Sequence, residues 1–211
     1  MKQALIFDLD GTLWDALLPI TNSWNKAMKK NKKPYSFNVA TIKTFMGLTP
    51  EETAVIAFPD VSLLEGMNLF ALCLEEEIMD LATIPGTLYN FEREVLEKLS
   101  AKYDLFIVSN CDKGYIENYL NAHKMNKYFA DHTCIGDTGL PKWKNIIFLK
   151  NKYHIDDIIY IGDTEKDKIE SNKAGVKFIH ATYGFGNVDN DKYYIDSLLD
   201  LPDKVEELFN Y

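Results

Sequence analysis

The sequence predicts an α/β protein with a doubly wound parallel sheet and an inserted all-helical segment. Short, continuous apolar runs end in polar or glycine residues, as at residues 4–10, 105–110 and 158–163, and helical patterns separate them. Such runs are typical of strands buried on both faces, and strands that alternate with helices favour a parallel sheet. A further observation indicates the insertion, because no strand pattern occurs between residues 16 and 84.

The composition is that of an ordinary globular protein. The 211 residues are 46% hydrophobic and 26% charged, enough for one substantial core or a core domain with a smaller partner. The formal net charge of −9 argues against a nucleic-acid-binding surface, which needs clustered lysine and arginine. A small anionic substrate is still compatible, because a local lysine and a metal ion can override the overall field. Since Arg93 is the only arginine, we expect the cation of any site to be a lysine.

The three cysteines predict neither a disulfide framework nor a zinc site. Cys73, Cys111 and Cys134 are odd in number, scattered and without C-x-x-C spacing. No apolar stretch approaches the length of a membrane span, and the first strand pattern begins without a signal sequence before it. We therefore expect a cytoplasmic protein that has no membrane partner.

The first apolar run leads directly into two carboxylates. Residues 4–7 (Ala-Leu-Ile-Phe) predict a buried strand, and Asp8, Asp10, Gly11 and Thr12 follow it. Open α/β sheets place their ligand sites at the carboxyl ends of such strands. Two like charges at a buried edge repel one another unless a cation compensates them. Because hard oxygen ligands suit Mg²⁺, this metal is the simplest compensating cation.

The inserted segment is expected to consist of helices. Apolar residues recur at helical spacing along most of it. The expected helices cover residues 19–30, 36–44 and 62–81, and a further helix begins at residues 49–52. Ser36 is the expected N-cap of the second helix, and Thr49 followed by Pro50 and two glutamates is a helix-start signature.

The end of the insertion is punctuated by Ile84, Pro85 and Gly86. We therefore expect a core domain formed by residues 1–15 and 85–211 and a helical domain formed by residues 16–84. The three glutamates at residues 75–77 are interpreted as the solvated flank of the last inserted helix and not as a metal cluster.

The rest of the core alternates strands and helices. Beyond the first strand, the expected strands cover residues 105–108, 134–136, 158–161 and 176–181. The expected helices cover residues 91–99, 113–122, 145–153, 165–174 and 205–209. Gly175 is the expected C-terminal stop of the fourth of these helices. This alternation again favours a doubly wound parallel sheet.

Polar residues that follow these strands would converge at one edge of the sheet. Ser109 follows the second strand, Asp163 follows a later one, and Lys142 lies in an expected loop at the same edge. Together with Asp8 and Asp10 they form a cluster of carboxylates, a hydroxyl and a lysine. Such a site suits phosphoryl chemistry, because a metal and a lysine neutralise phosphate charge while a carboxylate attacks phosphorus.

In order and type, these residues resemble the four motifs of haloacid-dehalogenase (HAD) superfamily phosphatases, in the phosphoglycolate phosphatase-like branch with a helical cap after the first strand. Residues 8–12 (Asp-Leu-Asp-Gly-Thr) match the first motif, Ser109-Asn110 the second and residues 162–167 (Gly-Asp-Thr-Glu-Lys-Asp) the fourth. The third motif is only a lysine in a loop, for which Lys142 fits best and Lys144 is the alternative. The resemblance spans nearly the whole chain and implies a Rossmann-like HAD core.

The resemblance implies Mg²⁺-dependent hydrolysis of a small phosphate monoester through an aspartyl-phosphate intermediate. Asp8 would be the nucleophile, and Asp10 would protonate the leaving alcohol before acting as the base for water. The family's metal ligands correspond to Asp8, the carbonyl oxygen of Asp10, Asp163 and, as an outer or orienting group, Asp167. Its phosphate-binding and orienting positions correspond to Ser109, Asn110, Lys142 and, in support of the acids, Thr12.

Other reactions stay open at this stage. A β-phosphoglucomutase-like phosphotransferase shares all four motifs but usually has a cap arginine, which this segment lacks. Haloacid dehalogenases generally lack the second acid, so Asp10 favours phosphoryl transfer. A phosphonoacetaldehyde hydrolase would use a cap lysine, and the context of Lys43 does not match that use. A phospho-accepting signalling domain would place its aspartate after a later strand and would have no helical insertion.

The sequence leaves the substrate open. A closing cap excludes large molecules, so small esters such as phosphoglycolate or sugar phosphates are expected, with specificity from the loop at residues 46–49. Trp14 and Trp24 are expected to be core residues, with Trp14 close enough to the acids to touch a substrate. A monomer is the default expectation, and a dimer through the cap is compatible with the sequence.

Overall fold

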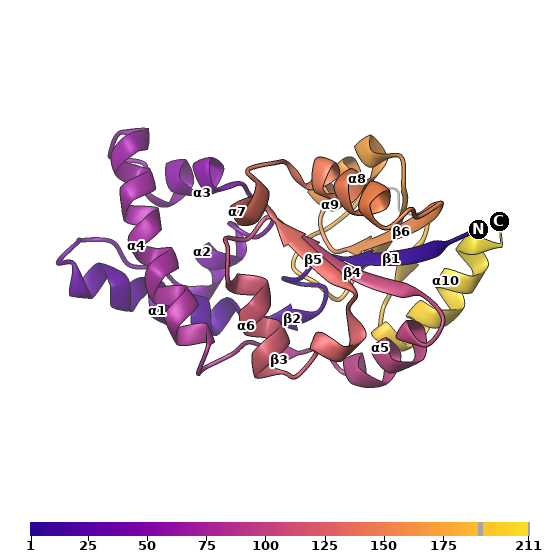
Figure 1. The fold of residues 1–211 in the computed structure, drawn as a ribbon. Coiled ribbons are helices and arrows are strands. Elements are labelled where there is room, and N and C mark those ends of the chain that lie inside the picture. Colours follow the sequence, from indigo (N-terminus) through magenta and orange to yellow (C-terminus); the bar gives the residue numbers. More distant parts are fainter. Residues whose placement is uncertain (190–191, 211) are drawn as a thin grey trace.

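The computed structural model describes residues 1–189 and 192–210. Figure 1 shows a group of helices on the left and, on the right, a sheet with helices on both sides. The two ends of the chain lie together at the right, at the end of the sheet that points away from the helical group. Among the described residues, no helix combines the length and the apolar character needed to cross a membrane.

The central sheet is formed by six parallel strands of the described chain. In spatial order they are β5 (Asp131–Cys134), β4 (Asp104–Ser109), β1 (Gln3–Phe7), β6 (Asp157–Gly162), β7 (Lys177–Ala181) and β8 (Tyr194–Ile195). The first strand lies in the middle, where Phe7 is paired with Ile107 of β4 and Ile161 of β6. Since all pairings are parallel, the carboxyl ends of β1, β4 and β6 meet at one edge.

Successive residues of β1 face opposite sides of the sheet, and helices cover both sides. Leu5 and Phe7 belong to the larger apolar cluster, whereas Ala4 and Ile6 belong to a second one. The larger cluster includes residues of α5 (Glu92–Ser100), α6 (Tyr115–Ala122) and α10 (Leu201–Phe209). The second includes residues of α8 (Lys142–Lys152), beside which α9 (Glu165–Ala174) packs. The predicted doubly wound α/β class is confirmed.

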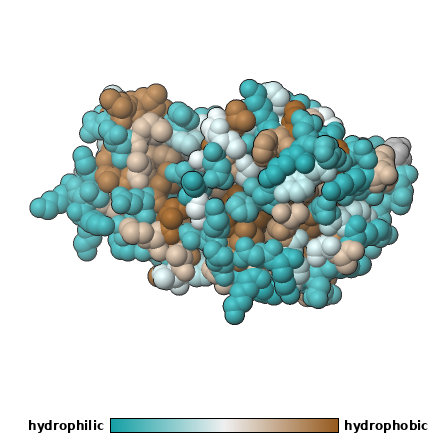
Figure 2. Space-filling model, viewed as in Figure 1, coloured by the Kyte–Doolittle hydropathy of each residue, from teal (hydrophilic) through white to brown (hydrophobic). Residues whose placement is uncertain are grey.

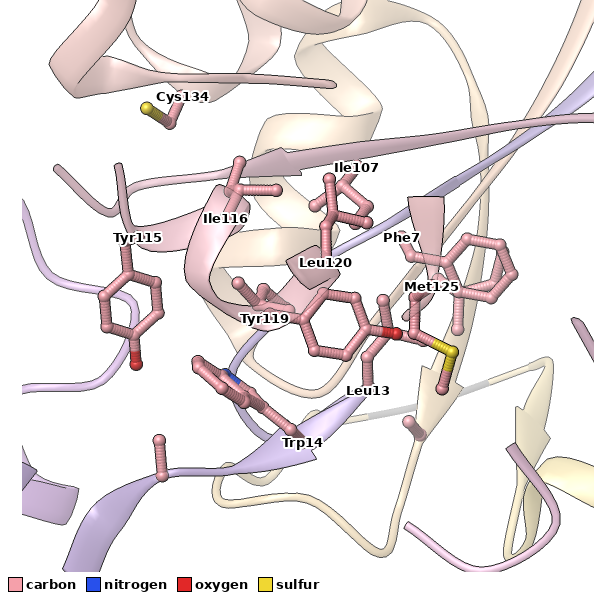
Figure 3. Close-up of a cluster of buried hydrophobic side chains, with 14 of the residues drawn as sticks. Phe7, Leu13, Trp14, Ile107, Tyr115, Ile116, Tyr119, Leu120, Met125 and Cys134 are labelled. Carbon is pink, nitrogen blue, oxygen red and sulfur yellow. The ribbon is translucent and has the colours of Figure 1, made fainter. Parts of the chain in front are cut away.

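Aromatic packing fixes the segment after β1 against α6. Figure 3 shows Tyr115 and Tyr119 projecting from α6 toward Trp14. Both tyrosine rings lie 5.4 Å from the Trp14 ring, centroid to centroid, and meet it edge to face. Trp14 is fully buried, as predicted. A rigid aromatic contact thus holds the turn that carries the two acids of the first motif.

A small antiparallel ribbon joins the sheet region to the inserted helices. It consists of β2 (Trp14–Asp15) and β3 (Thr87–Leu88), with Trp14 paired to Leu88. The two ends of the insertion therefore lie side by side. A Cβ atom on Gly86 would come within 2.8 Å of the Asp15 carbonyl oxygen, so this approach requires glycine. The ribbon was not predicted, because strands of two residues leave no periodic pattern.

The helical part comprises α1 (Leu17–Lys30), α2 (Val39–Lys43), α3 (Pro50–Ala57) and α4 (Leu63–Leu81). The longest helices, α1 and α4, pack along one another (Figure 1). Lys26 and Lys30 of α1 form ion pairs of 2.7 and 3.0 Å with Glu76 of α4. Figure 2 shows a largely hydrophilic face with apolar atoms gathered over the beginning of α4, where Leu63 and Leu64 are exposed.

Caps explain where two of these helices begin. Thr49 and Glu52 form the reciprocal capping box of α3, with Pro50 in the first turn, which confirms the predicted start. Ser36 is not the cap of α2. Asn38 takes that place, and its Oδ1 accepts a hydrogen bond of 2.9 Å from the Thr41 amide. The extended, β-region backbone of Asn38 is the conformation that an N-cap needs.

Several predicted boundaries in the core were wrong, among them the start of α10, which begins at Leu201 and not at residue 205. The strand expected at residues 134–136 is β5, which ends at Cys134, and Ile135–Thr138 forms the short helix α7. Lys142 was expected in a loop but is the first residue of α8, preceded by Pro141 in an extended conformation. Short 3₁₀ helices at Asn126–Tyr128 and Leu198–Asp200 complete the described elements.

The prediction that residues 75–77 form a solvated flank was wrong for two of the three glutamates. Glu75 is exposed, but Glu76 and Glu77 are only 5% and 4% exposed. Glu76 is buried because it pairs with the lysines of α1. Glu77 is buried at the junction with the core, where its Oε2 accepts a hydrogen bond from Nε1 of Trp24.

Candidate active site

The turn after β1 positions both acids of the first motif. The amides of Leu13 and Trp14 donate hydrogen bonds to the Leu9 carbonyl oxygen at 2.9 and 3.2 Å, which closes the chain into a tight turn. Gly11 lies in this turn with a φ of +79°, in the left-handed region. A Cβ atom at Gly11 would lie 2.2 Å from Oδ2 of Asp163. The turn is therefore pressed against the end of β6 so closely that it needs glycine.

Asp8 is buried beside the one lysine among the described residues that lines the cavity above it. Nζ of Lys142 lies 3.0 Å from Oδ1 of Asp8 and 2.5 Å from Oδ1 of Asp167. Burial tends to lower the pKa of Lys142, but the two carboxylates outweigh that effect and hold it well above its ordinary value. Lys142 therefore carries a permanent positive charge at the carboxyl edge of the sheet.

Three buried carboxylates converge at this edge. Oxygen atoms of Asp8, Asp163 and Asp167 all lie within 4.8 Å of one another. Burial, reinforced by the charge of Asp167, raises the pKa of Asp8 to about 7 although Lys142 opposes the shift. Burial and the charges of Asp167 and Asp8 likewise raise the pKa of Asp163 well above its usual range. One lysine is thus too little positive charge for this group.

The same group fits a divalent metal ion. Oδ1 of Asp163 is buried and has no hydrogen-bond partner among the described residues, which is costly for a carboxylate without a cation. Its other oxygen is held by the amides of Phe185 at 2.7 Å and Gly186 at 3.3 Å. Carboxylate oxygens from different elements are the donors that Mg²⁺ prefers. The predicted metal-binding residues Asp8, Asp163 and Asp167 are thus brought together.

Asp167 is the most firmly held of the three carboxylates. Its Oδ2 accepts hydrogen bonds from the amide of Thr164 at 3.0 Å and from the Thr164 hydroxyl at 2.6 Å. Thr164 in turn caps α9, completing a capping box. Because its other oxygen faces Lys142, both oxygens of Asp167 are already engaged. This arrangement suits the outer, orienting position expected for it.

The Asp10 carboxylate has a different environment and does not belong to that group of three. Its Oδ1 accepts hydrogen bonds from Nε1 of Trp14 at 3.0 Å and from the hydroxyl of Tyr115 at 2.7 Å. Burial raises the pKa of Asp10 to about 6 against these two hydrogen bonds. Asp10 is therefore an acid that can gain or lose a proton near neutral pH.

The second motif lies at the end of β4. Ser109 is buried and, with Asp8, Asp10 and Lys142, lines the same cavity. Asn110 also lines this cavity, and its Nδ2 donates a hydrogen bond of 3.1 Å to the carbonyl oxygen of Gly47. Asn110 thus links the core to the loop of the helical part that follows α2.

The two remaining predicted positions lie outside the cavity lining. Thr12 is fully buried, and its carbonyl oxygen accepts a hydrogen bond from the Tyr183 hydroxyl. Its own hydroxyl has no hydrogen-bond partner in the part of the chain that the structure describes. Lys144 is exposed on α8, with its Nζ 5.4 Å from the ring of Trp143. Between the two lysines considered for the third motif, Lys142 is the one that reaches Asp8.

The cavity of about 90 Å³ extends from these acids to the inner face of the helical part. The helical side is mostly apolar and aromatic. It is formed by Ile20, Trp24, Phe45, Met46, Leu48, Phe70, Leu74 and Glu77, among others. The cavity therefore combines a charged floor at the sheet edge with an apolar upper wall.

A protein-family model described as a haloacid dehalogenase-like hydrolase matches residues 5–181, from the first strand to the end of β7. The chain belongs to the haloacid dehalogenase-like hydrolase family. The family recognised from the motifs, and with it the hydrolase class, is confirmed.

Similar proteins cover almost the whole of this HAD-like chain. A phosphoglycolate phosphatase of Vibrio parahaemolyticus is 23% identical over 95% of this chain and 95% of its own length. A phosphoglycolate phosphatase of Nitrosospira multiformis is 27% identical over 92% and 88%. A solved haloacid dehalogenase-like family hydrolase from Streptococcus pneumoniae, 22% identical, superposes with a TM-score of 0.81 over 97% of this chain and 98% of that one. The last similarity confirms the fold.

Two polar groups of this HAD-like site were not predicted. Tyr115, which holds Asp10, belongs to α6 and carries no motif of its own. Glu77 lines the cavity from α4, although it stands in an acidic run that resembles a solvated helix face. Helical spacing offered a signal for Glu77, since Phe70, Cys73 and Leu81 of the same helix are buried at intervals of three and four residues from one another and from it.

Proposed function

We propose that the chain is a Mg²⁺-dependent phosphatase that hydrolyses small phosphate monoesters through an aspartyl-phosphate at Asp8. The observation that carries this proposal is the contrast between the two acids of one turn. Asp8 faces Lys142 and two further carboxylates, whereas Asp10 is held apart by Trp14 and Tyr115. The similar proteins that are named phosphoglycolate phosphatases support the same interpretation.

In the first step, Oδ of ionised Asp8 attacks phosphorus and the bond to the leaving oxygen breaks. Lys142 and Ser109 contact the phosphoryl oxygens and stabilise their charge as it develops. Asp10, in its acid form, donates its proton to the leaving alcohol. Its pKa of about 6 places this proton transfer within reach at neutral pH.

In the second step, Asp10 acts as a base. Now ionised, it takes a proton from a water molecule whose oxygen attacks the phosphorus of the acyl phosphate. The bond from phosphorus to Asp8 breaks, inorganic phosphate leaves, and Asp10 holds a proton again. Trp14 and Tyr115 keep the Asp10 carboxylate in place through both steps.

Asp8, Asp163 and the carbonyl oxygen of Asp10 would hold the magnesium ion, with Asp167 in an outer position. The bound ion supplies the positive charge that keeps Asp8 ionised and offsets the charge of the phosphoryl group. Asp163 is pre-positioned for this role by the two amides that hold its Oδ2. Thr12, which is fully buried in the same turn, would support the two acids.

The helical part is proposed to act as a cap over the cavity, as a domain of residues 16–84 on a core of residues 1–15 and 85–211. The ribbon of β2 and β3 and the hydrogen bond from Asn110 to Gly47 join the two. A cap over a cavity of about 90 Å³ admits only a small leaving group. A monomeric state and a cytoplasmic location stay predictions.

Phosphate release from p-nitrophenyl phosphate tests the proposal. The protein is assayed with Mg²⁺ and with a chelator, alongside Asp8→Asn and Asp10→Asn. We expect phosphate release to require the metal and to be absent in Asp8→Asn. In Asp10→Asn we expect the steady-state rate of phosphate release to be lost. Lys144 is exposed, so Lys144→Met is the matched control, and its phosphate release is expected to be unchanged. Full activity of Asp8→Asn, or no release by a folded, Mg²⁺-loaded protein, would contradict the proposed function.

A further inference from the structure

The cap side of the cavity contains one ionisable group that the proposed reaction does not use. Glu77 is only 4% exposed, and its Oε2 accepts a hydrogen bond of 2.5 Å from Nε1 of Trp24. Its Oε1 has no hydrogen-bond partner among the described residues, and Glu77 lines the cavity. A buried carboxyl group that lines a cavity and has one oxygen without a hydrogen-bond partner has the chemistry of a ligand-binding group.

No cation of the described protein is available to this carboxyl group. The lysines of α1 that reach α4, Lys26 and Lys30, form their ion pairs with Glu76 and Asp80. Burial raises the pKa of Glu77 to about 8 against the hydrogen bond from Trp24. Among the described residues, the ionised form of Glu77 therefore has no cationic partner, and a positively charged ligand would supply one.

The rest of the cavity lining has the same bias in charge. Its carboxyl groups are those of Asp8, Asp10, Glu77 and Asp112, and its one cationic side chain among the described residues is Lys142. Lys142, the one cation in this part of the described chain, is engaged with Asp8 and Asp167 at the floor. A negatively charged leaving group at the cap side would meet the carboxyl group of Glu77, and no lysine or arginine of the described helical part lines the cavity there.

Aromatic rings pack on Trp24, the hydrogen-bond partner of Glu77. The ring of Trp24 is stacked on that of Phe45 with centroids 5.6 Å apart, and the ring of Phe70 meets Trp24 edge to face at 5.6 Å. All three line the cavity. Aromatic rings beside a carboxylate form a favourable environment for an ammonium group, because ring faces and carboxylate both attract positive charge.

Resting on the proposed phosphatase activity, we propose that the substrate is the phosphate ester of a short amino alcohol. Its ammonium group binds to Glu77 within the aromatic wall formed by Trp24, Phe45 and Phe70, while its phosphate lies over Asp8. Esters with a carboxylate in the same place, as in phosphoglycolate, are poor substrates. This substrate class differs from the one in the names of the similar proteins, which are 23% and 27% identical to this chain.

Three esters of nearly equal size, which differ in the charge at the end of the leaving group, test this proposal directly. They are 2-aminoethyl phosphate, 2-hydroxyethyl phosphate and phosphoglycolate, which place an ammonium, a hydroxyl or a carboxylate at the same distance from phosphorus. The measurement is kcat/KM for each with the full-length Mg²⁺-loaded protein. We expect 2-aminoethyl phosphate to exceed phosphoglycolate by about 10- to 100-fold, the range that one charge-assisted hydrogen bond provides.

Glu77→Gln keeps the shape of the side chain and removes its charge. This variant is expected to lower kcat/KM for 2-aminoethyl phosphate by about tenfold or more. The ratio of kcat/KM for 2-aminoethyl phosphate to that for phosphoglycolate should fall by the same factor. Glu75→Gln, an exposed position in the same acidic run, is the matched control and leaves the ranking unchanged. A purely structural Glu77 would instead lower kcat/KM for all three esters by an equal factor.

The outcomes distinguish this inference from the proposed function. Turnover of p-nitrophenyl phosphate together with a preference for phosphoglycolate would overturn the inference and leave the phosphatase activity intact. An equal loss for all three esters in Glu77→Gln would overturn it too. If that variant does not fold, the ranking of the three esters by the unaltered protein still decides the question. No turnover of any ester, p-nitrophenyl phosphate included, would contradict the proposed function itself.

Discussion

Replacement of Lys142 by methionine tests the electrostatics of the site. Lys142 is 2% exposed and stands against Asp8 at 3.0 Å and Asp167 at 2.5 Å. Methionine retains much of the length and apolar surface of the side chain but removes its charge. In the metal-free protein, the carboxylates of Asp8, Asp163 and Asp167 then share one buried site without a cation.

The expected cost follows from the burial of these groups. Removing one partner of a buried ion pair typically destabilises a protein by about 3–5 kcal/mol, because the remaining charge is left uncompensated. The loss depends on pH in a defined direction. The pKa of Asp8, about 7 beside Lys142, rises further without it. Above about pH 7 the native variant therefore binds more protons than the native parent protein, so the difference in stability grows as pH rises beyond this value and is smallest below it.

Urea unfolding of the metal-free proteins, followed by tryptophan fluorescence at several pH values, measures this effect. Lys144→Met is the control, because Lys144 is exposed two residues away, and it is expected to change stability by less than about 0.5 kcal/mol. A loss below about 1 kcal/mol for Lys142→Met, or an equal loss for both variants, would refute the argument that Lys142 is the buried counterion. A loss that grew toward acid pH would refute the direction of the pKa shifts.

Three more predictions concern burial, close packing and the metal. Burial raises the pKa of Glu92 from 4.5 to about 8, so the free energy of unfolding falls as pH rises between these values. In urea unfolding at several pH values, Glu92→Gln is expected to remove this pH dependence. Glu97→Gln, at an exposed position, is the control that keeps it. Gly184→Ala places a Cβ atom 2.3 Å from that of Asp163 and is expected to cost about 1–3 kcal/mol or more by urea unfolding, with an unchanged midpoint as the contrary result. Mg²⁺ at about 100 times its Kd should stabilise the protein by about 2.7 kcal/mol in thermal unfolding; an equal gain in Asp163→Asn would speak against this site.

The central strands and their polar ends were predictable because buried parallel strands are continuously apolar. The run before Ser109 and the run before Asp163 stop where the chain reaches the sheet edge, so the change of polarity marks the site. The signal fails for β5, the outermost strand on one side of the sheet. In the described sheet the strand Asp131–Cys134 pairs only with β4 and begins with partly exposed polar residues. Its predicted start was therefore three residues too late.

The supporting groups of the site depend on contacts between distant segments. Tyr115 reaches Asp10 only because α6 packs against the turn after β1, a contact that no spacing in the sequence encodes. Glu77 shows the opposite case, since its helical spacing from Phe70 and Cys73 indicated a buried face. Two further glutamates beside it suggested solvent instead. A buried carboxyl group is therefore hard to recognise within an acidic run when only one face of the helix packs against the rest of the protein.

Direct detection of a phosphorylated Asp8 tests the central claim, that this carboxylate is the nucleophile. The Asp10→Asn variant lacks the base for the second step, and p-nitrophenolate leaves without an acid, so the acyl phosphate should accumulate with p-nitrophenyl phosphate and Mg²⁺. After acid quenching, peptide mass spectrometry is expected to show one phosphoryl group on the peptide with Asp8, absent from the Asp8→Asn, Asp10→Asn double variant. Phosphorylation at another residue, or p-nitrophenol release by that double variant at the same rate, would contradict the account.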